Sequence, residues 1–352
     1  MMKIKLAILD RDSNYLRRVV GAFSLYYADR LEVYSFTDTE TALSALTSNR
    51  IQVFLAAHDA APDLKRIPEG CGFAYLVEMT GVDMLDDQAA VCKFQSAEML
   101  YKQVLDIFSR SAKNLEIIPG SGGSSLLLFA SPCGGVGTST MAAGCAMHFA
   151  AQGKKALYLD LQVCGSAEIY FRAAGALDFG DVIYAAKSRG ANLTMKIESC
   201  VRQDASGVYF FAPARVALDV RDLRAEEIRQ ILNTLQYSGG YDYIVADMDF
   251  SLEKEHAELM QLADHAVWVS DGSERAASKM QRALEALRLI DSGEQTAAQK
   301  ISLYYNRLRK KEPHVALPEE LRLCGSLPEL DSGTERDAAA YMAEKNLFAP
   351  LA

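Results

Sequence analysis

The stretch SPCGGVGTST, residues 131–140, decides the fold of the second half of this chain. It follows an apolar run of strand length, 126–130, and precedes a helical stretch, 141–152. A strand, a glycine loop and a helix in this order are the context that a phosphate-binding loop requires. Glycines let successive backbone N–H groups converge on phosphate oxygens, and the helix N-terminus adds the positive end of its dipole. An ordinary glycine turn between a strand and a helix is the alternative, so further motifs are needed to distinguish it from a phosphate-binding loop.

Four later strand-like runs carry polar residues or proline near their carboxyl ends. The runs are 155–160, 241–247, 301–307 and 323–329, and the residues concerned are Asp160, Asp247, Asn306 and Pro328. Any single parallel strand can end in aspartate. Four such ends in this order after a glycine loop resemble the motif series of the MinD/ParA family, and this resemblance implies one doubly wound α/β nucleotide-binding domain over residues 126–352.

The loop resembles the deviant Walker A motif KGGxGK[ST][ST] of the MinD/ParA family of P-loop NTPases. The resemblance implies that ATP and Mg²⁺ are the cofactors. It assigns phosphate binding to Gly134, Gly135, Val136, Gly137, Thr138, Ser139 and Thr140. It assigns Mg²⁺ to Ser139, Asp160 and Asp247, and the adenine ring to Asn306, Arg307 and Pro328.

Three departures from that family concern the chemistry of hydrolysis. Cys133 stands where the signature lysine is expected, Thr138 replaces the central Walker lysine, and Gln162 replaces the second switch aspartate. Phosphoryl transfer rests mostly on charge stabilisation and positioning. We therefore expect ATP to bind through backbone amides and Mg²⁺ with weak or no hydrolysis. No residue is assigned a catalytic role, and whether the chain is an enzyme stays open.

The first half of the chain alternates strand-like and helical segments. Apolar runs at 4–9, 31–36, 53–57 and 73–77 separate helical patterns at 13–27, 38–46 and 97–108. Such alternation predicts a parallel sheet covered by helices, here a flavodoxin-like domain. The run PGSGGSS at 119–125 has the composition of a flexible linker, although a long surface loop is an alternative. We therefore divide the chain into a domain at 1–112, a linker at 113–125 and a domain at 126–352.

This first domain resembles a response-regulator receiver domain that has lost its phosphoacceptor. Asp10 and Asp12 follow the first strand, where receivers keep an acidic pair, and Lys93 lies where they keep a lysine. The third strand ends in Ala57, which has no oxygen to phosphorylate, and only a slip in register would bring Asp59 into its place. Asp12 is equally well explained as the N-cap of a helix or as a remnant of a metal site.

A degenerate receiver followed by a lysine-free GGVGTST loop resembles the TadZ/CpaE group of Flp (Tad) pilus assembly proteins. The resemblance implies a localisation factor that forms a homodimer around nucleotide. It would recruit the pilus secretion ATPase and membrane platform. A working partition-type ATPase that cycles between monomer and dimer is the alternative.

Composition limits the remaining options. The net charge of −9 disfavours direct binding to nucleic acid, because an acidic surface repels phosphate backbones. The seven cysteines are scattered singly, as in a reduced cytoplasmic protein. The expected location is the cytoplasm, with recruitment to the membrane or a cell pole as an option. The C-terminal stretch 338–348 lacks the basic face of a membrane-binding helix, so membrane contact is expected to be indirect.

Overall fold

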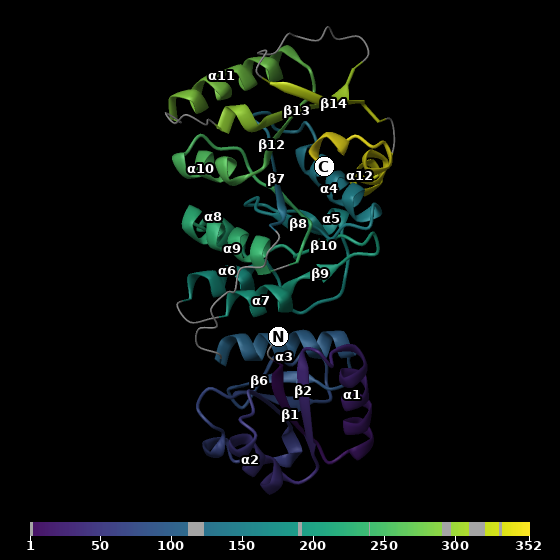
Figure 1. Ribbon diagram of the computed structural model, residues 1–352, viewed down its shortest axis with the longest axis vertical. Helices are drawn as coiled ribbons and strands as arrows, with labels where there is room; N and C mark the ends of the chain where they lie inside the picture. The colour runs from purple at the N-terminus through teal and green to yellow at the C-terminus, as the bar shows by residue number, and fades with distance from the viewer. Residues whose placement is uncertain are drawn as a thin grey trace. The chain divides into compact units, whose positions relative to one another are not determined.

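The computed structural model describes residues 3–111, 123–188, 192–238, 240–290, 297–309, 321–330 and 333–352. Contacts between Cα atoms divide the chain into two units (Figure 1). The first is Met1–Glu116 with Ser188–Ser199, and the second is Ile117–Lys187 with Cys200–Ala352. Most of the linker expected at 113–125 lies outside the described residues.

The first unit contains a sheet whose described strands pair in the order β2-β1-β3-β4-β6-β5. Neighbouring strands are parallel except for the antiparallel pair β5–β6. The strands are β1 (Ile4–Leu9), β2 (Leu31–Phe36), β3 (Val53–Ala57), β4 (Gly72–Val77), β5 (Met84–Leu85) and β6 (Gln88–Cys92). The helices are α1 (Ser13–Tyr26), α2 (Thr39–Ser48) and α3 (Ala97–Ser111), with 3₁₀ turns at His58–Ala60 and Leu64–Arg66. This is the flavodoxin-like arrangement that the sequence predicts.

Each face of this first sheet has its own apolar core. One cluster joins β-strand residues such as Leu6 and Leu55 to Phe23 of α1 and Val104 of α3. The other joins Ala7, Phe54 and Ala56 to residues of α2. Helices α1 and α3 therefore cover one face and α2 covers the other, as alternating right-handed crossovers require.

The second unit contains a larger sheet with the order β14-β13-β12-β7-β11-β8-β10-β9. Its described strand pairs are parallel except β9–β10. The strands are β7 (Ser125–Ala130), β8 (Ala156–Asp160), β9 (Arg202–Gln203), β10 (Tyr209–Phe210), β11 (Tyr243–Asp247), β12 (His265–Ser270), β13 (Ile301–Leu308) and β14 (Arg322–Pro328). The helices that follow Thr138 are α4 (Thr138–Ala151), α5 (Ala167–Tyr170), α6 (Phe179–Lys187), α7 (Leu193–Cys200, mostly grouped with the first unit), α8 (Ala217–Arg221), α9 (Ala225–Ser238), α10 (Lys254–Leu262), α11 (Glu274–Ile290) and α12 (Glu335–Glu344). Further 3₁₀ turns lie at Ala297–Lys300 and Ala349–Leu351.

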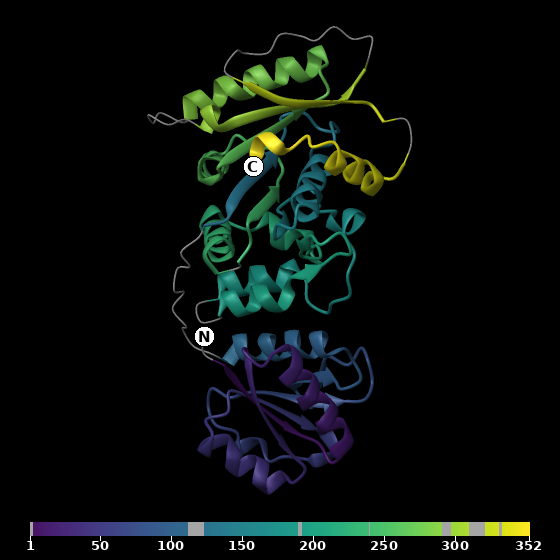
Figure 2. The ribbon, with the colours of Figure 1, turned by 45° about the vertical axis from the view of Figure 1, so that its right-hand side comes forward.

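Helices α4 and α12 pack against each other on one side of the larger sheet, and α9 and α10 lie on the other (Figures 1 and 2). The contact is close at Gly144, where an added Cβ would lie 2.9 Å from the carbonyl oxygen of Ala339. Within the described residues, no helix combines the length and apolarity needed to cross a membrane. The final helix thus packs on its own domain, and its partner α4 is the helix that begins at the glycine loop.

Candidate functional site

The glycine loop connects the carboxyl end of β7 to the first turn of α4. Gly135 and Gly137 have φ angles of 77° and 83°, a left-handed conformation that side chains with a Cβ rarely adopt. Gly137 is also the residue that caps α4. A cavity of about 460 Å³ lies over this loop, lined by most of residues 131–140. The loop therefore has the backbone geometry of an anion cradle at a helix N-terminus.

Neither expected lysine position supplies a charge to this cavity. The Cys133 side chain is buried, and its thiol donates to the carbonyl oxygen of Ala276 at 3.5 Å. Burial raises the pKa of Cys133 above its usual value, so the thiol stays neutral. Thr138 lines the cavity with an uncharged hydroxyl. Among the described residues that line it, Arg307 alone carries a positive charge.

Arg307 comes from β13 and reaches the loop from the side. Its Nη1 donates to the carbonyl oxygen of Gly135 at 3.0 Å, and its φ angle of 57° is unusual for a residue with a side chain. The arginine thus lies beside the loop and places a positive charge at the edge of the cavity.

Two aspartates meet at the carboxyl ends of neighbouring strands below the loop. Asp160 of β8 and Asp247 of β11 are register partners. Asp247 is fully buried, and its Oδ2 accepts a hydrogen bond from the Tyr158 hydroxyl at 2.9 Å. Burial, and next the charge of Asp160, raises the pKa of Asp247 to about 7. Its other oxygen, Oδ1, is buried and has no hydrogen bond of regular geometry in the part of the chain that the structure describes, although the nearby Ser139 hydroxyl acts to lower the pKa of Asp247.

Asp160 has a different environment, because the chain itself uses its oxygens. They accept backbone N–H groups from Gln162 at 3.1 Å, Ser166 at 2.7 Å and Ala167 at 3.1 Å. Burial raises the pKa of Asp160 to about 6, although these N–H groups act in the opposite direction. The close approach also requires a glycine at position 165, where a Cβ would lie 2.7 Å from Asp160 Oδ2. Asp160 therefore holds the loop that follows β8.

A magnesium ion is compatible with Asp247 and Ser139. Mg²⁺ prefers oxygen ligands and usually binds through one or two carboxylates with waters and substrate phosphates. The unpartnered Oδ1 of Asp247 offers such an oxygen, and the Ser139 hydroxyl, which donates to Gln162 Oε1 at 3.2 Å, offers another. Within the described residues no group of three or more His, Cys, Asp or Glu side chains could hold a metal alone. The site therefore fits an ion that arrives with phosphate oxygens.

The three residues expected at the adenine ring are placed differently from one another. Asn306 is buried, and its Nδ2 donates to the carbonyl oxygen of Val136 at 2.9 Å, so it fixes the glycine loop. Asn306 and Arg307 also line a second cavity of about 260 Å³ together with Glu329 and Leu330. Pro328 ends β14 next to this cavity but is not among the residues that line it.

Glu335 is a site residue that the sequence did not reveal. It lies in the first turn of α12 and lines both cavities. Its Oε2 accepts a hydrogen bond from the Thr140 hydroxyl at 2.6 Å, and its Oε1 lies 3.5 Å from Arg307 Nη2. The sequence around it, Thr334 to Asp337, forms a capping box and so marks only a helix start. A negative charge thus touches the end of the phosphate loop.

In the first unit the receiver-type charges neutralise one another. Lys93 Nζ lies 3.4 Å from Asp10 Oδ2 and 3.0 Å from Glu78 Oε1. Asp12 caps α1 by accepting the backbone N–H groups of the second and third residues of the helix. Ala57 ends β3 as expected, and Asp59 lies on an exposed 3₁₀ turn after it. The capping role expected for Asp12 is therefore present.

Comparisons with known proteins agree with both halves of this description. Residues 2–109 match a family model described as TadZ-like, receiver domain. A ParA family ATPase from Chlorobium tepidum TLS superposes with a TM-score of 0.51 at 15% identity, covering 65% of this chain and 94% of that one. At this identity the likeness shows the fold alone.

Two further solved structures are less similar. MinD from Pyrococcus horikoshii OT3, complexed with Mg-ADP, has a TM-score of 0.46 at 16% identity and covers 63% of this chain and 95% of its own. MinD in the MinC:MinD complex of Aquifex aeolicus has a TM-score of 0.43 at 19% identity, with coverages of 62% and 86%. A search of the curated proteins gave no match.

The fold and the loop define a two-unit α/β protein in which a receiver-like domain precedes a domain with a glycine loop and the fold of a ParA family ATPase. The match to the TadZ-like receiver domain covers residues 2–109, less than a third of the chain. The TadZ-like family is therefore shown for the receiver domain at residues 2–109.

Proposed function

We propose that this protein binds Mg-ATP in its P-loop domain without rapid hydrolysis and serves as a localisation scaffold for Flp (Tad) pilus assembly. The observation that carries the proposal is the glycine loop at a helix N-terminus, kept in left-handed geometry while Cys133 and Thr138 occupy both lysine positions. The TadZ-like receiver domain supports the assignment to pilus assembly.

In this proposal the backbone N–H groups of residues 134–140 bind the phosphates, and Arg307 adds a positive charge beside them. Ser139 and Asp247 would hold Mg²⁺, which would screen charge between the phosphate oxygens. Asp160, whose oxygens hold the following loop, would act on the ion through Asp247. The base would occupy the cavity beside Asn306 and Arg307, next to Glu329.

The missing lysines explain why slow turnover is expected. Charge stabilisation of a transferring phosphoryl group contributes several orders of magnitude in rate. The Arg307 guanidinium is already engaged by Gly135 and by Glu335, so it is less available for that task. Binding, in contrast, needs only the amide cradle and the ion.

The proposed assembly is a homodimer around nucleotide, formed by the domain at 126–352. The receiver-like domain at 1–112, joined through 113–125, would present the dimer to the secretion ATPase and membrane platform. Such a scaffold works in the cytoplasm and reaches the membrane or pole through its partners. Direct contact with nucleic acid is not part of the proposal, because the chain carries a net charge of −9.

Calorimetry and phosphate release together test the proposal. The full chain should bind ATP in the presence of Mg²⁺ and lose that binding with EDTA or with Asp247→Asn. It should release phosphate at less than about one per minute, well below ordinary enzyme turnover. No heat with saturating Mg-ATP would refute nucleotide binding. Rapid Mg-dependent phosphate release that Asp247→Ala abolishes would instead favour a partition-type ATPase that cycles between monomer and dimer.

The scaffold role needs a separate test in cells. A fluorescent fusion should form foci, and pilus assembly should fail when the gene is deleted. Asp247→Asn should reproduce that failure if nucleotide controls the scaffold. Normal pili in the deletion strain would contradict the pilus assignment while leaving nucleotide binding intact.

A further inference from the structure

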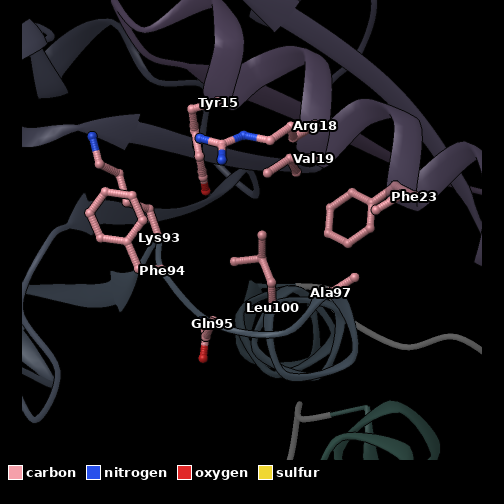
Figure 3. A pocket seen from close by; sticks show the side chains of 10 residues that line it. Tyr15, Arg18, Val19, Phe23, Lys93, Phe94, Gln95, Ala97 and Leu100 are labelled. Atoms are coloured by element: carbon pink, nitrogen blue, oxygen red, sulfur yellow. The ribbon is translucent and has the colours of Figure 1, made fainter.

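The receiver-like unit contains a cavity of about 260 Å³ between α1 and the start of α3. Val19, Phe23 and Leu100 form an apolar wall, and Phe94, which is 59% exposed, lies at the opposite side (Figure 3). The cavity is smaller than the pockets of about 300–1,000 Å³ that hold whole small-molecule ligands. Its size suits a single large side chain, and anchors of this kind dominate many protein interfaces.

A buried hydroxyl without a partner lies in the same cavity. Tyr15 is only 3% exposed, and its hydroxyl has no hydrogen-bond partner in the described residues. In Figure 3 this hydroxyl points toward the space between Phe94 and Leu100. Burial raises the pKa of Tyr15 far above its usual value, so the group remains a hydrogen-bond donor. An unsatisfied buried donor destabilises the folded protein, and a ligand oxygen would remove that cost.

The charge beside the cavity is positive and comes from α1. Arg18 lines the cavity, is exposed and forms no ion pair within the described part of the chain. Lys93 also lines it, but Asp10 and Glu78 already neutralise that cation. Arg18 is therefore the cation best placed to meet an incoming carboxylate, on a protein whose net charge is −9.

We propose that this cavity binds an aromatic side chain of a partner protein that has an aspartate or glutamate next to it. The ring would lie against Val19, Phe23 and Leu100, and the carboxylate would pair with Arg18 and accept the Tyr15 hydroxyl. Pairing an ionised donor with a carboxylate gives a stronger hydrogen bond than two neutral groups do. This inference does not depend on nucleotide binding, since all of these residues belong to the first unit.

Short peptides test the chemistry directly. We would measure binding of acetyl-Asp-Phe-amide to the full chain by saturation-transfer NMR, with acetyl-Asn-Phe-amide and acetyl-Asp-Ala-amide as matched probes. The first should bind, and each of the others should bind at least about fivefold more weakly, the scale of one exposed ion pair or one lost apolar contact. Equal binding of the Asp and Asn peptides would overturn the proposal. So would the absence of binding by any peptide at concentrations of about 10 mM, roughly the limit for ligands with a single anchor.

Variants on α1 separate this site from general attraction to a basic helix. Arg18→Gln should weaken acetyl-Asp-Phe-amide about fivefold, whereas Arg17→Gln, an adjacent exposed arginine outside the cavity lining, should leave binding unchanged. Tyr15→Phe should weaken binding while a thermal melt shows a folded protein. Equal losses for Arg17→Gln and Arg18→Gln would refute a defined site.

A final arm distinguishes a protein partner from a free acid. The compound 3-phenylpropionate carries a ring and a carboxylate without a peptide backbone. Weaker binding than that of the Asp-Phe peptide supports a protein partner. If 3-phenylpropionate saturates the cavity while none of the peptides binds, the cavity is a site for a small aromatic acid, and the proposal of a protein partner is refuted.

Discussion

Replacing Asp247 by asparagine should stabilise the protein at pH 8 while it abolishes the response to magnesium. The folded state holds the pKa of this fully buried carboxyl at about 7, against an ordinary value of 3.8. That difference is about three pKa units, and each unit corresponds to about 1.4 kcal/mol. Ionised Asp247 therefore destabilises the folded protein by about 4 kcal/mol at pH 8 in the absence of a cation.

Asparagine keeps the shape and removes the charge, but it does not recover the whole amount. Its carbonyl oxygen can still accept from Tyr158. Its NH₂ group would replace the unpartnered Oδ1 and remain a buried donor without an acceptor, which costs about 1–3 kcal/mol. The expected net gain of Asp247→Asn at pH 8 is therefore about 2 kcal/mol.

The sign of the effect reverses with pH. Because the folded-state pKa of Asp247 is raised, its contribution to stability is fully present below pH 3.8 and is lost as the pH rises through about 7. Across this window the wild-type protein should lose stability relative to the variant. Near pH 4 both groups are neutral in the folded state, and the variant should be the less stable of the two, since its NH₂ group leaves two buried donors without an acceptor where the protonated carboxyl leaves one.

Urea unfolding between pH 4 and 8, with EDTA present, measures this crossing. Asp249→Asn is the matched control two residues away. That carboxyl is exposed, and the asparagine oxygen can still accept the backbone N–H of Val163, so stability should change by less than about 0.5 kcal/mol. Adding Mg-ATP at pH 8 should stabilise the wild type and leave Asp247→Asn unchanged. Parallel pH curves for wild type and Asp247→Asn would show that this carboxyl does not carry the raised pKa and would refute the reasoning.

Three further predictions concern the loop and a buried histidine. Gly137→Ala should reduce Mg-ATP affinity at least tenfold in calorimetry, because a Cβ at φ 83° would collide with the Asn306 side chain. Gly134→Ala is the control and should keep a folded loop, since no atom lies within 4 Å of its Cβ. Equal losses of Mg-ATP affinity in the two variants would contradict this account. Thr138→Lys should tighten ATP binding by at least about tenfold, the effect of a restored phosphate contact, and unchanged affinity would show that this position faces away from the phosphates. His256 is buried, and burial lowers its pKa to about 4, so its stabilising contribution at neutral pH is lost as the pH falls below 6.5. In urea unfolding, the free energy of unfolding of the wild type should therefore fall by about 2 kcal/mol more than that of His256→Leu between pH 7 and 5. Equal decreases in the two proteins would exclude His256 as the cause.

Strand positions in both units could be predicted because they depend on local pattern. The apolar runs at 4–9, 31–36 and 53–57 coincide with β1, β2 and β3, since a buried parallel strand needs a continuous apolar segment. The short β5 and β9 could not be found in this way. Each has only two residues and depends on its partner strand rather than on its own sequence.

The site could be predicted only where one segment supplies it. The glycine loop could be recognised in the sequence, because the backbone geometry on which it depends is one that glycine adopts readily. The contact of Asn306 with Val136 and that of Glu335 with Thr140 join residues more than a hundred positions apart. No local pattern encodes such pairings, so the sequence revealed neither the contact of Asn306 with the loop nor the position of Glu335.

In both units the chain itself satisfies charges found at the strand ends. In the first unit Lys93 is neutralised by Asp10 and Glu78. In the second, backbone N–H groups satisfy Asp160. Asp247 differs from these groups, since one of its oxygens is buried without a partner and its raised pKa records the cost.

A protein that had lost every ligand would gain by replacing such a carboxyl, because a neutral residue of similar shape is easier to bury. The destabilising charge at Asp247 is therefore best understood as the remaining ligand-dependent group of the site. On this reasoning the second unit has no lysine at Cys133 or Thr138 of its glycine loop but retains a group that a bound Mg²⁺ would stabilise. The Asp247→Asn experiment tests that separation, because it predicts higher stability and lost magnesium dependence in the same variant.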